Sequence, residues 1–157
     1  MTRQSLFWAG LVLILFTVNA QIAHKQALLA RGRRVLLELA PVDPRSLIQG
    51  DYMILDYDVS RKASPAVAPG STGRLVLGMA VGDVGRYVRV HDGDALAPNE
   101  QLIRFRKRAR VQLGAEAFFF QEGERPRYQK ARFGELRVDS DGESVLVGLC
   151  DRELRPL

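Results

Sequence analysis

The chain is poor in the two residue types that most often bind metals or carry redox chemistry, with one cysteine and two histidines among 157 residues. A single cysteine excludes an intramolecular disulfide and any Cys-x-x-Cys site. Cys150 ends an apolar run, 145–150, which predicts a small buried strand residue rather than a reactive thiol. His24 adjoins an apolar segment, and His91 lies in an acidic turn that lacks the ligand spacing of a calcium loop. The sequence therefore predicts no metal and no cofactor.

Formal charge is absent from the twenty residues between Arg3 and His24. Twenty helical residues span about 30 Å, which is the thickness of the hydrocarbon core of a bilayer. Trp8 lies near one end of this segment, where an indole ring favours the membrane interface. The segment therefore predicts a membrane-spanning helix, with the lipid bilayer as its first partner.

A cleaved signal peptide is the alternative for this segment, with Val18-Asn19-Ala20 before Gln21 as a small-residue cleavage site. The helix-forming sequence, however, continues past Ala20 and reaches Gly32, which we interpret as a C′ glycine. A helix that continues to its own cap favours a retained anchor and stalk over residues 1–32, followed by one domain over residues 33–157.

The net charge of +5 is modest, and residues 24–157 hold 22 basic and 18 acidic side chains, a net charge of +4. No helix-turn-helix, zinc-finger or RNP-type pattern accompanies this excess, so we expect no nucleic acid as a partner. The basic run 104–110 is interpreted as edge-strand protection or as a contact with anionic lipid head groups.

Short strands separated by turn residues dominate the domain. We expect strands at 35–40, 52–59, 74–81, 85–90, 102–113 and 116–121, and a closing hairpin of 134–138 and 144–150. Alternation in 52–59 should direct Met53, Leu55, Tyr57 and Val59 into the core, and residues 60–73 should form a mobile loop. The fold class is mainly β: an N-terminal transmembrane helix followed by an antiparallel β-sandwich or small barrel.

The segment Gly50-Asp51-Tyr52-Met53-Ile54-Leu55-Asp56-Tyr57 resembles the pattern that names the GDYXXLXY family of bacterial proteins. Residues 41–47, 120–123 with Tyr128, and 132–138 are similar to the same family. The resemblance implies a membrane-anchored domain that is associated with multi-spanning membrane proteins, and it offers no catalytic residue to carry over. Our physical interpretation of the motif, at Gly50, Asp51, Tyr52, Leu55 and Tyr57, is a folding signature. Gly50 permits a tight turn, Asp51 accepts backbone hydrogen bonds, Leu55 and Tyr57 pack inward, and Tyr52 lies on the opposite face.

Residues 46–52 are also similar to the stretch that follows the nucleophile of membrane-anchored signal peptidases, which raises the alternative of a serine-type hydrolase. The nucleophile's position is taken here by Val42, Ser46 lies in a different register, and no lysine occurs between Lys25 and Lys62. We therefore expect no catalytic residue and no identifiable small-molecule ligand.

The expected function is that of a non-catalytic accessory or interaction domain beside a multi-spanning membrane partner. Two features of the sequence give opposite predictions for the side of the membrane on which the domain lies. Lys25, Arg31, Arg33 and Arg34 outnumber Arg3 and the α-amino group, which by the positive-inside rule places the domain in the cytoplasm. The layout of a short tail, an anchor and a large domain, together with the resemblance, instead favours the periplasmic side of a bacterial inner membrane.

Overall fold

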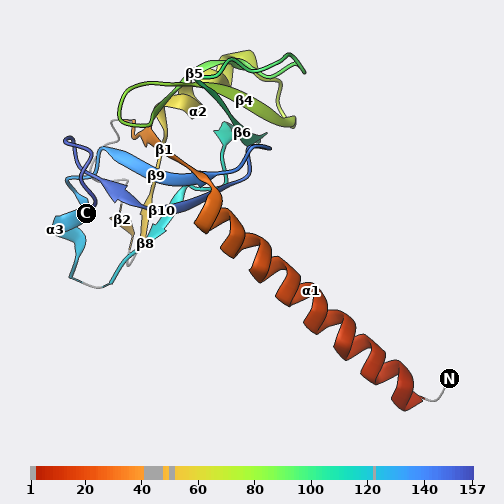
Figure 1. Cartoon of the computed structure of the whole chain (residues 1–157). Helices are drawn as coiled ribbons and strands as arrows, with labels where there is room; N and C mark the ends of the chain where they lie inside the picture. The colour runs from red at the N-terminus through yellow and green to blue at the C-terminus, as the bar shows by residue number, and fades with distance from the viewer. Residues whose placement is uncertain (1–2, 41–47, 50–51, 122) are drawn as a thin grey trace.

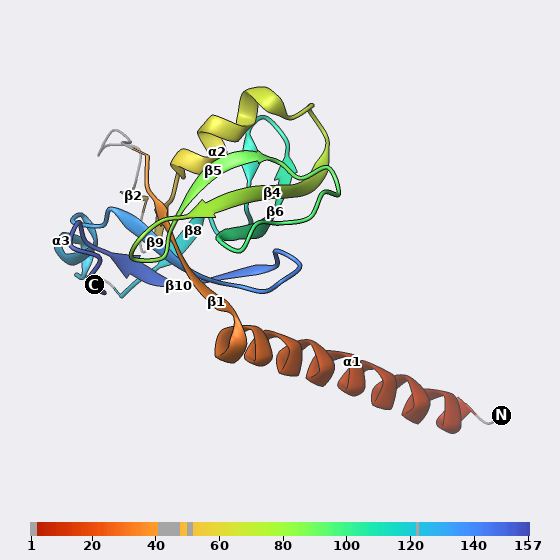
Figure 2. The ribbon, with the colours of Figure 1, turned by 45° about the horizontal axis from the view of Figure 1, so that its top comes forward.

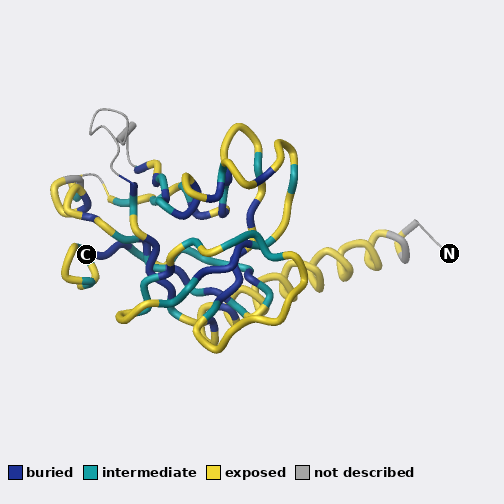
Figure 3. Tube along the Cα trace, turned by 90° about the horizontal axis from the view of Figure 1, so that it is seen from above, coloured by how far each residue is buried: buried dark blue, intermediate teal, exposed yellow. Residues whose placement is uncertain are grey.

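The computed structural model describes residues 3–40, 48–49, 52–121 and 123–157. Its first element, α1 (Arg3–Arg31), runs unbroken through Ala20 and projects away from the rest of the molecule (Figure 1). Figure 3 shows that α1 is exposed along most of its length, while buried residues concentrate inside the β-domain. The predicted continuous helix is confirmed, and it leads into the first strand with one residue between them.

Seven strands form one curled, mostly antiparallel sheet in the order β10-β9-β1-β5-β4-β6-β7 (Figures 1 and 2). Only the pairing of β1 with β5 is parallel among the described strands. This half-barrel confirms the mainly β fold class predicted after an N-terminal helix. Its strands are β1 (Arg33–Glu38), β4 (Thr72–Met79), β5 (Val84–Val90), β6 (Glu100–Lys107), β7 (Val111–Gln112), β9 (Phe133–Val138) and β10 (Ser144–Cys150).

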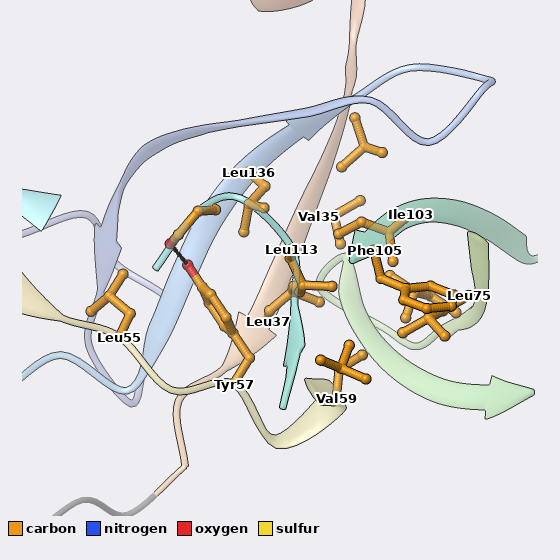
Figure 4. Packing of buried hydrophobic residues seen from close by; sticks show 14 of the residues in the cluster. Val35, Leu37, Leu55, Tyr57, Val59, Leu75, Ile103, Phe105, Leu113 and Leu136 are labelled. Carbon is orange, nitrogen blue, oxygen red and sulfur yellow. Dashed lines mark hydrogen bonds between the residues drawn. The ribbon is translucent and has the colours of Figure 1, made fainter. Parts of the chain in front are cut away.

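The inside of the half-barrel holds the core. In β1 the side chains of Val35, Leu36 and Leu37 are all fully buried, because this strand is bordered by β9 and β5 and covered on both faces. Figure 4 shows Val35, Leu37 and other core side chains gathered in the concave space of the sheet. The continuous apolar run in β1 is typical of a strand that is buried on both faces.

A smaller sheet of β2 (Ile48–Gln49), β3 (Tyr52–Ile54) and β8 (Ala117–Phe119) accompanies the half-barrel, in the order β2-β3-β8. Three short helical elements complete the chain: α2 (Asp58–Ala63), η1 (Ser64–Ala66) and α3 (Arg125–Tyr128). Helix α2 packs against β1, β5 and β7, so it fills the open side of the curled sheet.

The prediction of one strand over 52–59 and a mobile loop over 60–73 is wrong in its boundaries. The strand ends at Ile54, and α2 begins at Asp58, whose carboxylate pairs with Lys62 at 2.6 Å across one helical turn. The predicted inward residues are nevertheless all buried. Val59 and Ala63, four residues apart on α2, face the core, so Val59 satisfies both a two-residue and a helical periodicity.

The single strand predicted over 102–113 is two strands. β6 ends at Lys107, and the chain turns through Arg108–Arg110 into β7, which pairs back onto β6 through Lys107 and Val111. The interpretation of 104–110 as an edge strand is therefore wrong, because β6 is paired with β4 on one side and with β7 on the other.

Candidate functional site

Tyr57 is the part of the GDYXXLXY motif that is most tightly fixed by the fold. Its side chain is fully buried, and its hydroxyl donates a 2.6 Å hydrogen bond to the carbonyl oxygen of Ala115 (Figure 4). A β-carbon at position 134 would lie 2.9 Å from Cε1 of Tyr57, so the ring occupies space that only a glycine at 134 leaves open. Burial raises the pKa of the phenol. Tyr57 therefore holds the strand β9 and the β7–β8 connection together.

Of the other motif residues, Leu55 is buried in the core and Met53 lies beside it. Gly50 and Asp51 lie outside the described residues, so the roles predicted for them stay predictions. Tyr52 is half-buried on the opposite face, as predicted, where its ring lies 5.7 Å from that of Phe119 across the β3–β8 pair.

This outer face of β3 and β8 is apolar and exposed. Ile54 is 38% and Phe119 73% exposed. Tyr52 pairs with Phe119 and Ile54 pairs with Ala117 across the two strands, so all four side chains lie on this face. On the inner face, Phe118 packs edge-on against Tyr128 at 5.0 Å between ring centroids, and Phe120 lies 5.3 Å from the same ring. The aromatic run 118–120 therefore anchors α3 with its first and third rings and exposes its second.

The end of α1 is integrated into the domain. Leu28 is only 4% exposed, and its carbonyl oxygen accepts a 2.8 Å hydrogen bond from the Gly32 amide. The helix ends at Arg31, directly before Gly32, as predicted. The φ of Gly32 is not in the positive region, and a β-carbon there would lie 2.5 Å from the Leu28 oxygen and 3.1 Å from the Val138 amide nitrogen. The glycine is required by the close approach of the helix end to β9.

A cluster of ion pairs, here called the junction, joins α1 to the β9–β10 turn. Glu143 receives the Lys25 ammonium at 2.5 Å, the His24 ring at 3.1 Å and the Arg104 guanidinium at 3.4 Å. Hydrogen bonds from Lys25 and then His24 hold the pKa of the Glu143 carboxyl below its usual value. His24 and Lys25 are the first ionisable residues after the uncharged run, so the junction lies at the end of the apolar part of the helix.

Asp141, two residues earlier in the same turn, binds two arginines at once. Arg74 on β4 and Arg104 on β6 are directly opposed in register, and the Asp141 carboxylate pairs with both guanidinium groups. Like charges at opposed positions would repel each other, and the shared carboxylate removes that repulsion. Hydrogen bonds from Arg104 and then Arg74 lower the pKa of Asp141. The turn is also held by the Arg104 amide, which donates to the Gly142 carbonyl at 2.8 Å.

Cys150 is fully buried on β10, as predicted, and its thiol lies 3.5 Å from a carboxylate oxygen of Glu135. Burial and this carboxylate raise the pKa of the thiol to about 11. Arg34 donates to Glu135 at 3.0 Å and lowers the pKa of that carboxyl. The group is a structural ion pair beside an unreactive thiol.

The sequence-based hypotheses of catalysis and metal binding gain no support from the described part of the chain. Ser46 and Val42 fall outside the described residues. Within 3–40, 48–49, 52–121 and 123–157, no group of three or more His, Cys, Asp or Glu side chains could hold a metal ion. The junction and the two arginines bound by Asp141 were missed by the sequence analysis, because the residues of these ion pairs are separated by 37 to 119 positions.

One helical segment of the described residues, Phe7–Arg31, is long and apolar enough to cross a membrane. An N-terminal signal sequence meets the same criteria of length and composition. The fold and the junction thus define a class of protein in which an apolar N-terminal helix is joined directly to a curled β-domain. The chain belongs to the GDYXXLXY protein family, whose sequence pattern matches residues 14–149. No curated protein and no solved structure matches it.

Proposed function

We propose that this protein is a single-pass, membrane-anchored interaction domain without catalytic activity, which acts beside a multi-spanning membrane partner. The proposal places its domain on the periplasmic side of a bacterial inner membrane. The observation that carries the proposal is the junction, where Glu143 of the domain binds His24 and Lys25 of the helix. Because the domain is fixed to its helix, it keeps one orientation relative to the membrane and presents one surface to a neighbouring membrane protein.

The apolar helix supports the anchoring part of the proposal. The most hydrophobic window of Phe7–Arg31 has no residue buried against the rest of the chain, and side chains such as Phe16 and Ile14 are largely exposed. A helix that is apolar all round requires burial, and a bilayer provides it. All contacts from α1 to the domain described above start at His24 or later, so the preceding residues are free to lie in lipid.

A rigid connection supports the interaction part. Leu28 is buried against the domain, and a single residue, Gly32, separates α1 from β1. A flexible linker would leave the domain free to rotate, whereas here helix and domain share a hydrophobic contact, a backbone hydrogen bond and the ion pairs of Glu143.

The candidate contact surface is the outer face of β3 and β8, which exposes Ile54 and Phe119 beside Tyr52. Exposed aromatic side chains are enriched where proteins bind each other. In Figure 1 the β2 and β8 labels lie to the left of the point where α1 joins the domain, with the β8 label below those of β9 and β10. Because this surface belongs to the β-domain and not to α1, the proposal assigns it to an extramembrane part of the multi-spanning partner.

Co-purification in mild detergent tests the proposal. Wild-type protein should retain a multi-spanning membrane protein, identified by mass spectrometry, and Phe119→Ser should lose it. Val88→Ser is the matched control, since Val88 is an exposed apolar residue on β5, outside this face. Equal retention by wild type and Phe119→Ser would refute the contact surface, and the absence of any multi-spanning protein from the wild-type sample would refute the function.

Sidedness is tested separately by labelling intact cells. A cysteine introduced at Ser140, an exposed turn residue, should react with a membrane-impermeant maleimide if the domain is periplasmic. The natural Cys150 is buried and serves as an internal blank. Labelling only after cell lysis would place the domain in the cytoplasm and contradict the proposal.

A further inference from the structure

We propose that a basic groove at one end of the curled sheet binds the phosphate of an anionic phospholipid head group at the membrane surface. The groove has a volume of ≈ 670 Å³, and its charged lining is four arginines, Arg74, Arg104, Arg106 and Arg108, with one carboxylate, Glu116. Guanidinium groups match phosphate oxygens in geometry and in charge, so a cluster of four favours a phosphate-bearing ligand.

Two of these arginines are available for a ligand. Arg106 and Arg108 are exposed, and the ion pairs of the described residues include none for either. The carboxylate of Glu116 accepts hydrogen bonds from the backbone amides of Leu113 and Gly114, including 3.1 Å from Gly114, and it is one negative charge against four arginines. The groove therefore keeps a net positive charge that its own residues do not satisfy.

Asp141 organises the other two arginines. It binds Arg74 and Arg104 together and so fixes them at the wall of the groove that lies against the β9–β10 turn. Each guanidinium has five N–H donors, and the bonds to Asp141 and Glu143 use only some of them. The bound carboxylate thus orders the two side chains and leaves donors for a second anion.

The junction places this groove at the height of lipid head groups. Arg104 lines the groove and also contacts Glu143, which binds Lys25 at the end of the uncharged helix segment. If that segment spans the hydrocarbon core, Lys25 lies in the head-group layer, and Arg104 is two ion pairs away from it. In Figure 2 the start of β4, which carries the groove, lies on the side of the domain towards which α1 points.

The lining of the groove favours a lipid over a nucleic acid. Single-stranded nucleic acids are held by exposed aromatic rings on which bases stack. Phe105 is the aromatic residue of the groove lining, and it is buried in the core. A site of charge without stacking surface, next to a membrane helix, fits a phosphate on a lipid.

Native mass spectrometry of the full-length protein in detergent tests the proposal, with phosphatidylglycerol and phosphatidylcholine as titrated lipids. Wild-type protein should bind phosphatidylglycerol more tightly than phosphatidylcholine. Arg106→Gln combined with Arg108→Gln should weaken phosphatidylglycerol binding on the order of thirtyfold, since two basic residues near an anionic surface contribute on the order of 1 kcal/mol each. Arg61→Gln with Arg152→Gln is the matched control, with the same charge change at exposed sites outside the groove.

Other outcomes would overturn the assignment. Equal losses in the groove and control variants would show a general effect of net charge, and equal binding of both lipids would exclude a head-group site. Displacement of the lipid by an equal concentration of inorganic phosphate would assign the groove to free phosphate, and a stronger preference for an oligonucleotide would assign it to nucleic acid. Because Arg106 and Arg108 are exposed, the variants should keep the wild-type circular dichroism spectrum. Arg106→Lys with Arg108→Lys, which keeps the charge, should retain more affinity than the glutamine pair.

Discussion

The ring of Tyr57 lies against Gly134 so closely that a β-carbon at 134 would stand 2.9 Å from its Cε1 and 3.1 Å from its hydroxyl oxygen. The last tyrosine of the motif and a glycine in the closing hairpin are thus complementary in shape, although 77 positions separate them in the printed sequence. This contact, with the hydrogen bond to Ala115, gives the motif a structural role.

Tyr57→Phe should lower the free energy of unfolding by about 1 to 3 kcal/mol, because the buried carbonyl of Ala115 loses its hydroxyl donor. Thermal or urea unfolding of the full-length protein in detergent, followed by circular dichroism, measures the change. Tyr87→Phe is the control, since Tyr87 is only half-buried and lies outside the motif. Equal stability of Tyr57→Phe and wild type would contradict the assigned role of the hydroxyl.

Gly134→Ala should also destabilise the fold, by about 1 to 3 kcal/mol, because the added methyl group overlaps the Tyr57 ring. In a Tyr57→Leu background the same substitution should cost less, since the ring is gone. A double-mutant cycle with the unfolding measurement above gives the coupling between the two positions. Additive effects would show that the two residues do not constrain each other.

Glu143→Gln should loosen the helix from the domain. Nitroxide labels on cysteines introduced at Gln21 and Ser140 should give a narrow distance distribution in wild type and a broader one in the variant. The depressed pKa of Glu143 makes the junction stable above the carboxyl's ordinary value of 4.5, and its contribution is lost as the pH falls through the lower folded value. The wild-type distribution should therefore broaden on acidification, and the variant should respond less.

The matched control for that experiment is Glu153→Gln, which removes an exposed carboxylate whose partner, Arg155, lies far along the chain from α1. It should leave the distance distribution unchanged. A variant Glu143→Gln with the wild-type distribution would show that Leu28 and Gly32 alone hold the helix in place.

Cys150 should resist alkylation in the folded protein. With a thiol pKa of about 11, roughly one molecule in a thousand carries the thiolate at pH 8, and the side chain is fully buried. Incubation with iodoacetamide, followed by mass spectrometry, should show no adduct until denaturant is added. Rapid modification of native protein would mean that β10 opens readily.

Ser46→Ala should behave as wild type when it complements a deletion strain, because the proposed function needs no nucleophile. The level of the variant protein in membranes should be checked by immunoblot. Loss of complementation with a normal protein level would revive the serine-hydrolase alternative and contradict the proposed absence of catalysis.

Periodicity predicted most of the strands because each of them buries one face or both. Periodicity gave a wrong prediction at Val59, because both a strand and a helix would bury this residue. It also failed at Arg108–Arg110, where the chain turns between β6 and β7 within a basic run. Neighbouring residues in the sequence determine turns and helix starts. Residues 58–63 are helical because they pack as a helix against β1, β5 and β7.

By itself, the sequence determined the long apolar helix, the buried thiol, the inward set of motif residues and the membership of the GDYXXLXY family, since each depends on neighbouring residues. Only the tertiary structure decided the junction at Glu143, the pairing of Arg74 and Arg104 through Asp141, and the requirement for glycine at 32 and 134. These features join residues far apart in the chain, and the partners are ordinary charged or small residues. Their role arises from the way the half-barrel brings the closing hairpin against both the helix and β6.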